Sequence, residues 1–278
     1  MGSSLPSPRT VSQEIMSAEP APDAKYSLML MQWGQLVAHD VTHVPMTPGP
    51  DLYALPCTSC APGHPGCAPI PVPPGDPDLP PNHCIPFTRS LPGQAGLGPR
   101  QQPNQVTSYI DASMVYGSNQ CMSSQLRMRG GPLLKNNPHP SQASSGQRFK
   151  PLLPFSYSTH DCRSADRHCF YTGDLRVNEQ PGLTALHTVL MREHNRLAAE
   201  LGTINQHWDG EKIYEEARRI LAALVQHITY GEFVPRVLGQ EQLALYGLEL
   251  SPPGSYYQGY DQQCDATIDN EFATAAFR

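Results

Sequence analysis

The sequence predicts a mainly α-helical, loop-rich fold that is stapled by disulfides and contains little β-structure. Two segments, 183–201 and 213–228, repeat apolar residues at helical spacing, which is typical of helices that bury one face. The 278 residues include 30 prolines, which require much of the remaining chain to be irregular. Most of the eight cysteines lie in those irregular stretches, so disulfides are expected to hold them together.

The N-terminal third contains one expected helix between irregular segments. Residues 1–24 are polar and punctuated by proline, which predicts an extended arm. From Tyr26 to about Asp40 the chain is almost entirely Leu, Met, Val, Ala and Trp, and this predicts a helix buried on most sides. Residues 45–104 are dense in Pro, Gly and Cys and predict a long loop region.

The two strongest helical signals lie in the second half of the chain. One helix is expected to begin at Pro181, since proline favours the first helical position. Asp209 is expected to cap the second helix. The buried stripe of that second helix is expected to comprise Ile213, Ala217, Ile220, Leu221, Leu224 and Ile228. The other expectations are a short ordered segment at 105–118, irregular segments at 122–172 and 239–271, and a helix at 271–278.

Charge and cysteine usage exclude some classes of function. The net charge is −6 and the 19 basic residues form no dense block, so nucleic acid is not an expected partner. No apolar stretch is long and charge-free enough to span a bilayer. Cysteines in loops favour disulfides and an extracellular location, and the missing secretory signal predicts a piece of a longer precursor. The alternative is a zinc site formed by Cys57, Cys60, His64 and Cys67.

The expected helix before residue 41 carries three polar residues in an apolar run. Gln35 and His39 are four residues apart and therefore share one helical face. Asp40 points about 100° away, toward a different neighbour. Burying a histidine and a carboxylate that serve two different sites is costly. Taken by itself, the segment favours a core histidine with satisfied hydrogen bonds and an aspartate that caps the helix, and a functional role for both is the alternative.

A second polar pattern lies in the ordered segment near residue 110. In an extended loop, Thr107, Asp111 and Ser113 would present side-chain oxygens on one side, with the carbonyl of Tyr109 between them. Such oxygens suit calcium, a hard cation that takes six to eight ligands. One carboxylate is too little charge for a tight site, and Asp40 could supply the second. The alternative is an ordinary turn held by the Asp and Ser side chains.

The segment before the first strong helix pairs a guanidinium with a carboxylate. Arg176 and Glu179 can share one face of a turn, although such pairs are usually surface ion pairs worth little. His187 and His194 lie seven residues apart near one face of the following helix. No His-Glu-x-x-His motif is present, so a zinc protease is not expected.

Taken together and in order, these segments resemble the animal haem peroxidases. The similarity covers nearly the whole chain and thins out only over 46–82 and 122–160. The matching segments are Leu5–Arg9, Met31–Gln35, His39–Asp40, Cys84–Ser90, Thr107–Ser118, Gly173–Arg176 with Asn178–Glu179, His187 with Arg192–Arg196, Ile228–Tyr230 and Asn270–Arg278.

The resemblance implies a role for each matching polar residue. His39 would be the distal histidine, which takes a proton from peroxide and returns it to the leaving oxygen. Arg176 would stabilise negative charge as the O–O bond breaks. Gln35 would orient water, halide or peroxide, and Glu179 would form an ester with a haem methyl group. The implied calcium ligands are Asp40, Thr107, Tyr109, Asp111 and Ser113.

The sequence also departs from the family pattern. Ala38 stands where a second ester-forming aspartate is common, and Gln180 stands where methionine forms a sulfonium link. At most one covalent haem bond is therefore expected. The proximal histidine of the family lies just past Ala-Phe-Arg, where this sequence stops at Arg278, so no iron ligand is expected in this chain. Residues 1–278 are expected to form the distal part of a peroxidase domain that is inactive alone.

The implied function is a haem-dependent peroxidase that reduces hydrogen peroxide and oxidises phenolic, tyrosyl or halide donors in response to oxidative stress. One alternative is a catalytically inactive, calcium-stabilised extracellular module, which Ala38 and the missing iron ligand favour. A zinc-dependent protein built on the cysteine cluster is the third possibility.

Overall fold

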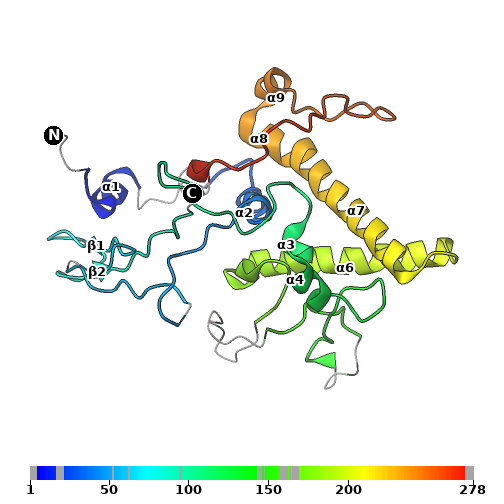
Figure 1. Ribbon diagram of the computed structural model, residues 1–278, viewed down its shortest axis with the longest axis horizontal. Coiled ribbons are helices and arrows are strands. Elements are labelled where there is room, and N and C mark those ends of the chain that lie inside the picture. The colour runs from blue at the N-terminus through cyan, green and yellow to red at the C-terminus, as the bar shows by residue number, and fades with distance from the viewer. Residues whose placement is uncertain are drawn as a thin grey trace. The chain divides into compact units, whose positions relative to one another are not determined.

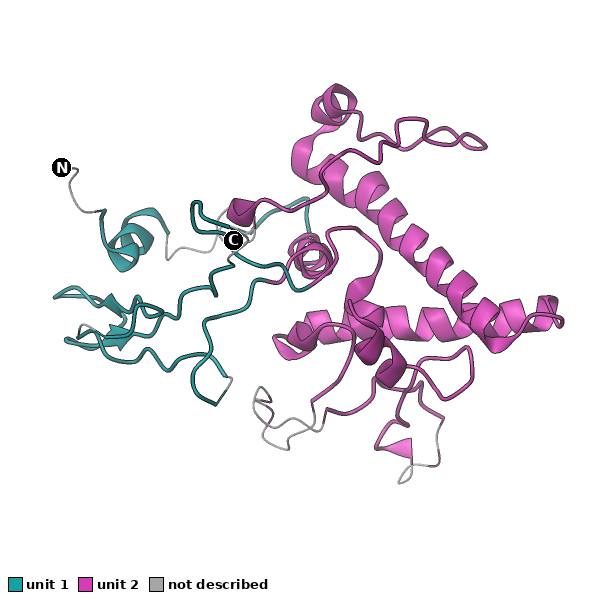
Figure 2. Cartoon of the chain, viewed as in Figure 1, with its two compact units in different colours: residues 1–26, 44–105 teal, residues 27–43, 106–278 magenta. Residues whose placement is uncertain are grey.

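The chain folds into two compact units in the computed structural model. Unit 1 consists of residues 1–26 and 44–105, and unit 2 of residues 27–43 and 106–278 (Figure 2). Helices dominate, and the sheet found among the described residues has two short strands, which confirms the predicted fold class. The residues that the structure describes are 5–16, 22–51, 53–61, 63–93, 96–142, 146, 148–156, 162, 164 and 169–272.

Unit 1 is built mainly of loops, as its proline content predicts. Helix α1 (Pro8–Ile15) begins at a proline, and strands β1 (Ile70–Pro71) and β2 (Cys84–Ile85) pair antiparallel. The helix falls inside the expected extended arm, which is a correction. Helix α1 is stabilised by a contact that the local sequence could not reveal, because the Arg9 guanidinium binds Asp76 at 2.6 Å and Asp78 at 2.8 Å.

Disulfides join the loop cysteines, as expected. Unit 1 contains the pairs Cys57–Cys67 and Cys60–Cys84, and unit 2 contains Cys162–Cys169. The zinc alternative is therefore wrong, because three of its four ligands are oxidised in these pairs. Cys121 and Cys264 keep free, exposed thiols.

Unit 2 carries the longer helices. The helices α6 and α7 meet at the connection 205–209 and diverge from there (Figure 1). Pro181 is the first residue of α6, and the Asp209 carboxylate accepts the backbone N–H of Lys212, so both helix starts are confirmed. The helical elements are α2 (Met29–Val41), α3 (Ser113–Tyr116), α4 (Gln120–Leu126), η1 (Leu175–Asn178), α6 (Pro181–Ile204), α7 (Gly210–Ile228), η2 (Thr229–Phe233), α8 (Val234–Leu238) and α9 (Gln240–Tyr246).

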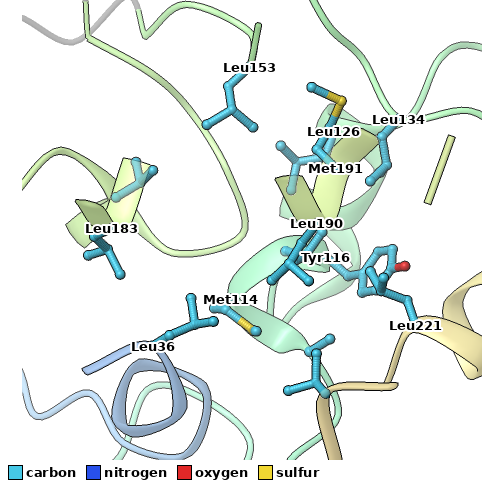
Figure 3. Packing of buried hydrophobic residues seen from close by; sticks show 14 of the residues in the cluster. Leu36, Met114, Tyr116, Leu126, Leu134, Leu153, Leu183, Leu190, Met191 and Leu221 are labelled. Carbon is cyan, nitrogen blue, oxygen red and sulfur yellow. The ribbon is translucent and has the colours of Figure 1, made fainter. Parts of the chain in front are cut away.

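The core of unit 2 is formed where α2, α3, α6 and α7 pack together. Leu36 of α2 belongs to the same buried cluster as Met114 of α3, Leu183 of α6 and Leu221 of α7 (Figure 3). A second, smaller cluster lies between α6 and α7. The core therefore holds α2, which carries the suspected functional residues, against α3 and α6.

Several local expectations are corrected in unit 2. Helix α4 overlaps the start of the expected loop 122–172, because Asn119 caps it and Leu126 is buried. Helix α9 interrupts the expected turns of 239–271, and only the first residues of the expected helix 271–278 are described.

The expected buried faces are also narrower than the sequence suggested. Ile220 and Leu224 of the α7 stripe are exposed, and so are Met29 and Met31 of α2. Each of these helices therefore buries one face rather than most of its circumference. Within the described residues, no helix combines the length and the apolar character needed to cross a membrane.

Candidate active site

Helix α2 positions Gln35 and His39 because two contacts anchor it to η2. The indole N–H of Trp33 donates to the hydroxyl of Thr229 at 3.1 Å. Gly34 leaves room for the ring of Phe233, since a Cβ at this position would lie 3.1 Å from that ring. The absence of a side chain at Gly34 thus lets η2 approach the helix that carries the polar face.

His39 is buried, with 4% of its surface exposed. Its Nε2 lies 3.8 Å from a carboxylate oxygen of Glu179. Burial and the nearby Arg176 guanidinium lower the pKa of His39 to about 3, so the imidazole is neutral at pH 7. Its Nδ1 is buried and makes no hydrogen bond to the described residues. A neutral imidazole that faces a carboxylate can accept a proton from a bound molecule.

Gln35 connects α2 to the segment that follows η1. Its amide nitrogen donates to Glu179 at 2.8 Å, and its carbonyl oxygen accepts from Gln32 at 3.3 Å and from Gln180. The expected shared face of Gln35 and His39 is therefore present, and both residues face the exposed carboxylate of Glu179.

Arg176 reaches α2 from η1. Its Nη2 donates to the backbone carbonyl of His39 at 3.1 Å. The same guanidinium forms a two-pronged ion pair with Asp174, at 2.9 Å from Nε and 2.6 Å from Nη2. Arg176 and Glu179, whose neighbouring charges alone would also fit a surface ion pair, both contact α2.

Sequence reasoning missed Asp174. This carboxylate is 2% exposed and caps η1 by accepting the backbone N–H of Arg176 at 2.8 Å. Burial would raise the pKa of Asp174, but its bonds to Arg176 outweigh burial and hold that pKa below the ordinary value. The available signal was a Gly-Asp-x-Arg pattern, in which an acid two residues before a suspected functional arginine can cap its turn.

The suspected oxygen ligands form a second cluster, on the other side of α2. Asp40 is fully buried, and its carboxylate accepts the Ser113 hydroxyl at 2.9 Å and the N–H of Ala112 at 3.0 Å. The hydroxyl of Thr107 donates to Asp111 at 2.9 Å. Burial, together with the charge of Asp111, raises the pKa of Asp40 to about 7. Two carboxylates and two hydroxyls are thus near one another.

The backbone around this cluster is unusual. Ala112 adopts φ of 61°, a left-handed conformation that is uncommon for alanine, and its N–H points at Asp40. The Tyr109 carbonyl accepts the N–H of Asp111 at 2.9 Å. Asp111 also accepts the N–H of Ser113, so the alternative of a side-chain-held turn describes part of this geometry. The described residues contain no group of three or more His, Cys, Asp or Glu side chains arranged for a metal.

The two histidines of α6 belong to the core. His194 contacts the Tyr116 hydroxyl at 2.8 Å and the Pro132 carbonyl at 2.9 Å. Burial lowers the pKa of His187 to about 4, and neither of its ring nitrogens has a partner among the described residues.

The family model for animal haem peroxidases matches residues 1–278. The chain belongs to this family. Curated animal haem peroxidases similar to it include peroxidasin of Drosophila melanogaster, 40% identical over 100% of this chain, and human myeloperoxidase, 41% identical over 97%. The chain spans only 18% of the length of the former and 36% of the length of the latter.

Two solved structures share the fold of this chain. Peroxidase A of Dictyostelium discoideum superposes with a TM-score of 0.75 at 24% identity, over 98% of this chain and 50% of that one. A fatty acid alpha-dioxygenase of Arabidopsis thaliana superposes with a TM-score of 0.62 at 18% identity, over 86% and 32%. At these identities the likeness concerns the fold alone.

Proposed function

We propose that this chain supplies the peroxide-binding residues of a haem-dependent peroxidase, which reduces hydrogen peroxide and oxidises phenolic, tyrosyl or halide donors. The observation that carries the proposal is the convergence of His39, Gln35, Arg176 and Glu179 from two separate segments of unit 2. Family membership supports the same reaction class. The runner-up is a catalytically inactive, calcium-stabilised module, and Ala38 favours it because a common ester-forming aspartate is replaced.

The chemistry of these residues fits haem. A neutral imidazole, an amide and a guanidinium are the groups that handle protons and negative charge beside a bound oxidant. His39 keeps one buried nitrogen that has no partner among the described residues, and Glu179 keeps an exposed carboxylate directed at α2. When bound, haem would supply the iron at which peroxide is reduced. Glu179 would hold haem through one ester, and the Ala38 and Gln180 positions offer no second covalent link.

Three side chains would each have a separate role in the reaction with peroxide. His39, kept neutral by burial and by Arg176, would accept the proton of the peroxide and return it to the departing oxygen. Arg176 would hold its guanidinium beside the negative charge that develops as the O–O bond breaks. Gln35 would orient the peroxide or a water. Its amide nitrogen donates to Glu179 at 2.8 Å, and this bond would hold the amide in place beside His39.

A calcium ion is proposed for the second cluster. Asp40, Asp111 and the hydroxyls of Thr107 and Ser113 offer the hard oxygen ligands that calcium prefers, with the Tyr109 carbonyl as a further donor. A divalent cation would also stabilise the ionised form of Asp40, which burial disfavours. Because Asp40 follows His39 directly, the ion would tie the histidine to α3.

The same proposal covers location, partners and the axial ligand. Three disulfides support an extracellular, oxidising environment. The proposed partners are hydrogen peroxide and small donors, and a role in the response to oxidative stress is consistent with that chemistry. The axial iron ligand is not assigned to any residue of this chain, so the isolated residues 1–278 are expected to be inactive.

Arg176→Ala is expected to slow the reaction of the haem-loaded, full-length protein with hydrogen peroxide by about 10²–10³-fold, because one charge-stabilising donor is lost. Stopped-flow absorbance of the haem band measures the rate. Arg192→Ala is the matched control, because its guanidinium donates to the backbone carbonyls of Pro151 and Lys150, away from the site. An effect below tenfold would contradict the role of Arg176, and failure to take up haem would favour the inactive module.

Removal of calcium is expected to lower thermal stability and peroxide reactivity together, because the ion would join α2 to α3. Asp111→Ala should reproduce both effects. Metal content by mass spectrometry, the unfolding midpoint and the stopped-flow rate provide the measurements. Glu211→Ala, an exposed acid near the N-terminus of α7, is the control. Unchanged stability and unchanged reactivity after chelation would show that this ligand set is wrong.

A further inference from the structure

Asp174 is a buried carboxylate with one dominant partner. Three of its hydrogen bonds go to Arg176: the backbone N–H at 2.8 Å, Nε at 2.9 Å and Nη2 at 2.6 Å. A two-pronged contact of this kind fixes the plane of a guanidinium as well as its position. The Arg176 Nη2 that binds Asp174 also donates to the His39 carbonyl.

The backbone of Asp174 is itself held in place. The Thr172 hydroxyl donates to the Asp174 carbonyl at 2.9 Å and accepts its N–H at 3.3 Å. Between these two residues lies Gly173, which is pressed against α3. A Cβ at position 173 would overlap backbone atoms of Ser113 and Gly117, so only glycine permits this approach.

These contacts close a ring. From His39 the ring passes along α2 to Asp40, whose carboxylate binds Ser113 at the start of α3. Backbone contact then joins α3 to Gly173, and the chain continues to Asp174. Arg176 completes the ring by donating to the His39 carbonyl. The cluster of oxygen ligands and the guanidinium are therefore connected on both sides of His39.

We infer that Asp174 is the positioning residue for Arg176, and that Gly173 connects its backbone to α3 and the oxygen cluster. This inference rests on the proposed role of Arg176 in the peroxide reaction. Asp174 would not touch peroxide. It would hold the guanidinium in the orientation that meets the developing charge, so that no reorientation is needed during the reaction. An ionised Asp174 is consistent with its lowered pKa.

Asp174→Asn tests the inference, since the amide keeps the shape and one acceptor oxygen but loses the charge and the second acceptor. The first measurement is hydrogen exchange of the Arg176 Nε–H by NMR in the full chain, with its signal identified by its loss in Arg176→Ala. We expect exchange to become at least about tenfold faster when the carboxylate partner is lost, since each 1.4 kcal/mol of protection is about a factor of ten. Asp209→Asn, another helix-capping aspartate, is the control and should leave this signal unchanged.

The second measurement is the peroxide reaction of the haem-loaded protein. Asp174→Asn should slow it by about 10²-fold, the typical cost of a misplaced group. If Asp174 acts through Arg176, adding Asp174→Asn to Arg176→Ala should change the rate by no more than about twofold. If the double variant instead loses the product of the two single rate reductions, the inference is overturned. Unchanged Nε–H exchange in Asp174→Asn would overturn it as well.

Two further results distinguish a failure of the inference from a failure to fold and from a failure of the proposed function. If Asp174→Asn does not fold, Thr172→Val removes the hydroxyl that locks the Asp174 backbone and should speed Nε–H exchange in the same direction. Unchanged exchange in that variant would count against the inference. If Arg176→Ala leaves the peroxide rate unaltered, the proposed role of Arg176 in the reaction fails, whereas the exchange measurement still decides whether Asp174 positions Arg176.

Discussion

Replacing His39 with alanine is expected to slow the reaction of the haem-loaded, full-length protein with hydrogen peroxide by about 10²–10⁴-fold, the usual contribution of a general acid–base group. His39 is buried with its Nε2 3.8 Å from Glu179, and burial together with Arg176 keeps it in the proton-accepting form. Stopped-flow absorbance measures the rate, and the haem content of the variant should equal that of the wild type because His39 is not proposed to hold haem.

His227→Ala provides the matched control, since this histidine is exposed near the C-terminal end of α7. Its reaction rate should equal that of the wild type. Equal rates in His39→Ala and wild type would assign proton transfer to another group. A loss of haem from His39→Ala would instead mean that the residue stabilises the pocket.

Leu36→Ala should lower the free energy of unfolding by about 2–5 kcal/mol, the cost of a large-to-small change in a packed core. Leu36 has none of its surface exposed and lies in the buried cluster that α2 shares with α3, α6 and α7 (Figure 3). Leu36 lies between Gln35 and His39 on α2, so looser packing of its side chain should also displace these two residues and slow the peroxide reaction. Denaturant unfolding followed by circular dichroism measures the first effect.

Met31→Ala is the control on the same helix, because 49% of the surface of Met31 is exposed. Its loss of stability should stay within about 0.5 kcal/mol, as for other surface substitutions. Equal losses in the two variants would mean that the buried face of α2 has been assigned wrongly.

Local signals in the sequence located the longest helices and the polar face of α2. Pro181 begins α6 and Asp209 caps α7, because the preferences of helix termini depend on a few neighbouring residues. Helix geometry alone places Gln35 and His39 on one face, and the contacts of both with Glu179 agree with that shared face. The roles of these residues remain predictions, which the experiments above address.

Short elements and burial were beyond the reach of local patterns. Helix α1 is held by an ion pair of Arg9 with Asp76, 67 residues away, and helix propensity alone could not reveal it. Ile220 and Leu224 share the apolar stripe of α7 but remain exposed, because burial depends on which neighbours cover a helix. The pairing of cysteines also depends on which loops meet, so the sequence could predict disulfides without their partners.

What the sequence determined by itself is the class of fold, the starts of α6 and α7, and the residue types available for acid–base chemistry. These depend on spacing, on backbone preferences and on the chemistry of single side chains. Only the tertiary structure decided that Gly173 must be glycine and that Arg176 reaches the backbone carbonyl of His39. Both depend on contacts of the segment 172–176 with α3 and with α2, stretches far apart in the chain whose approach no local pattern encodes.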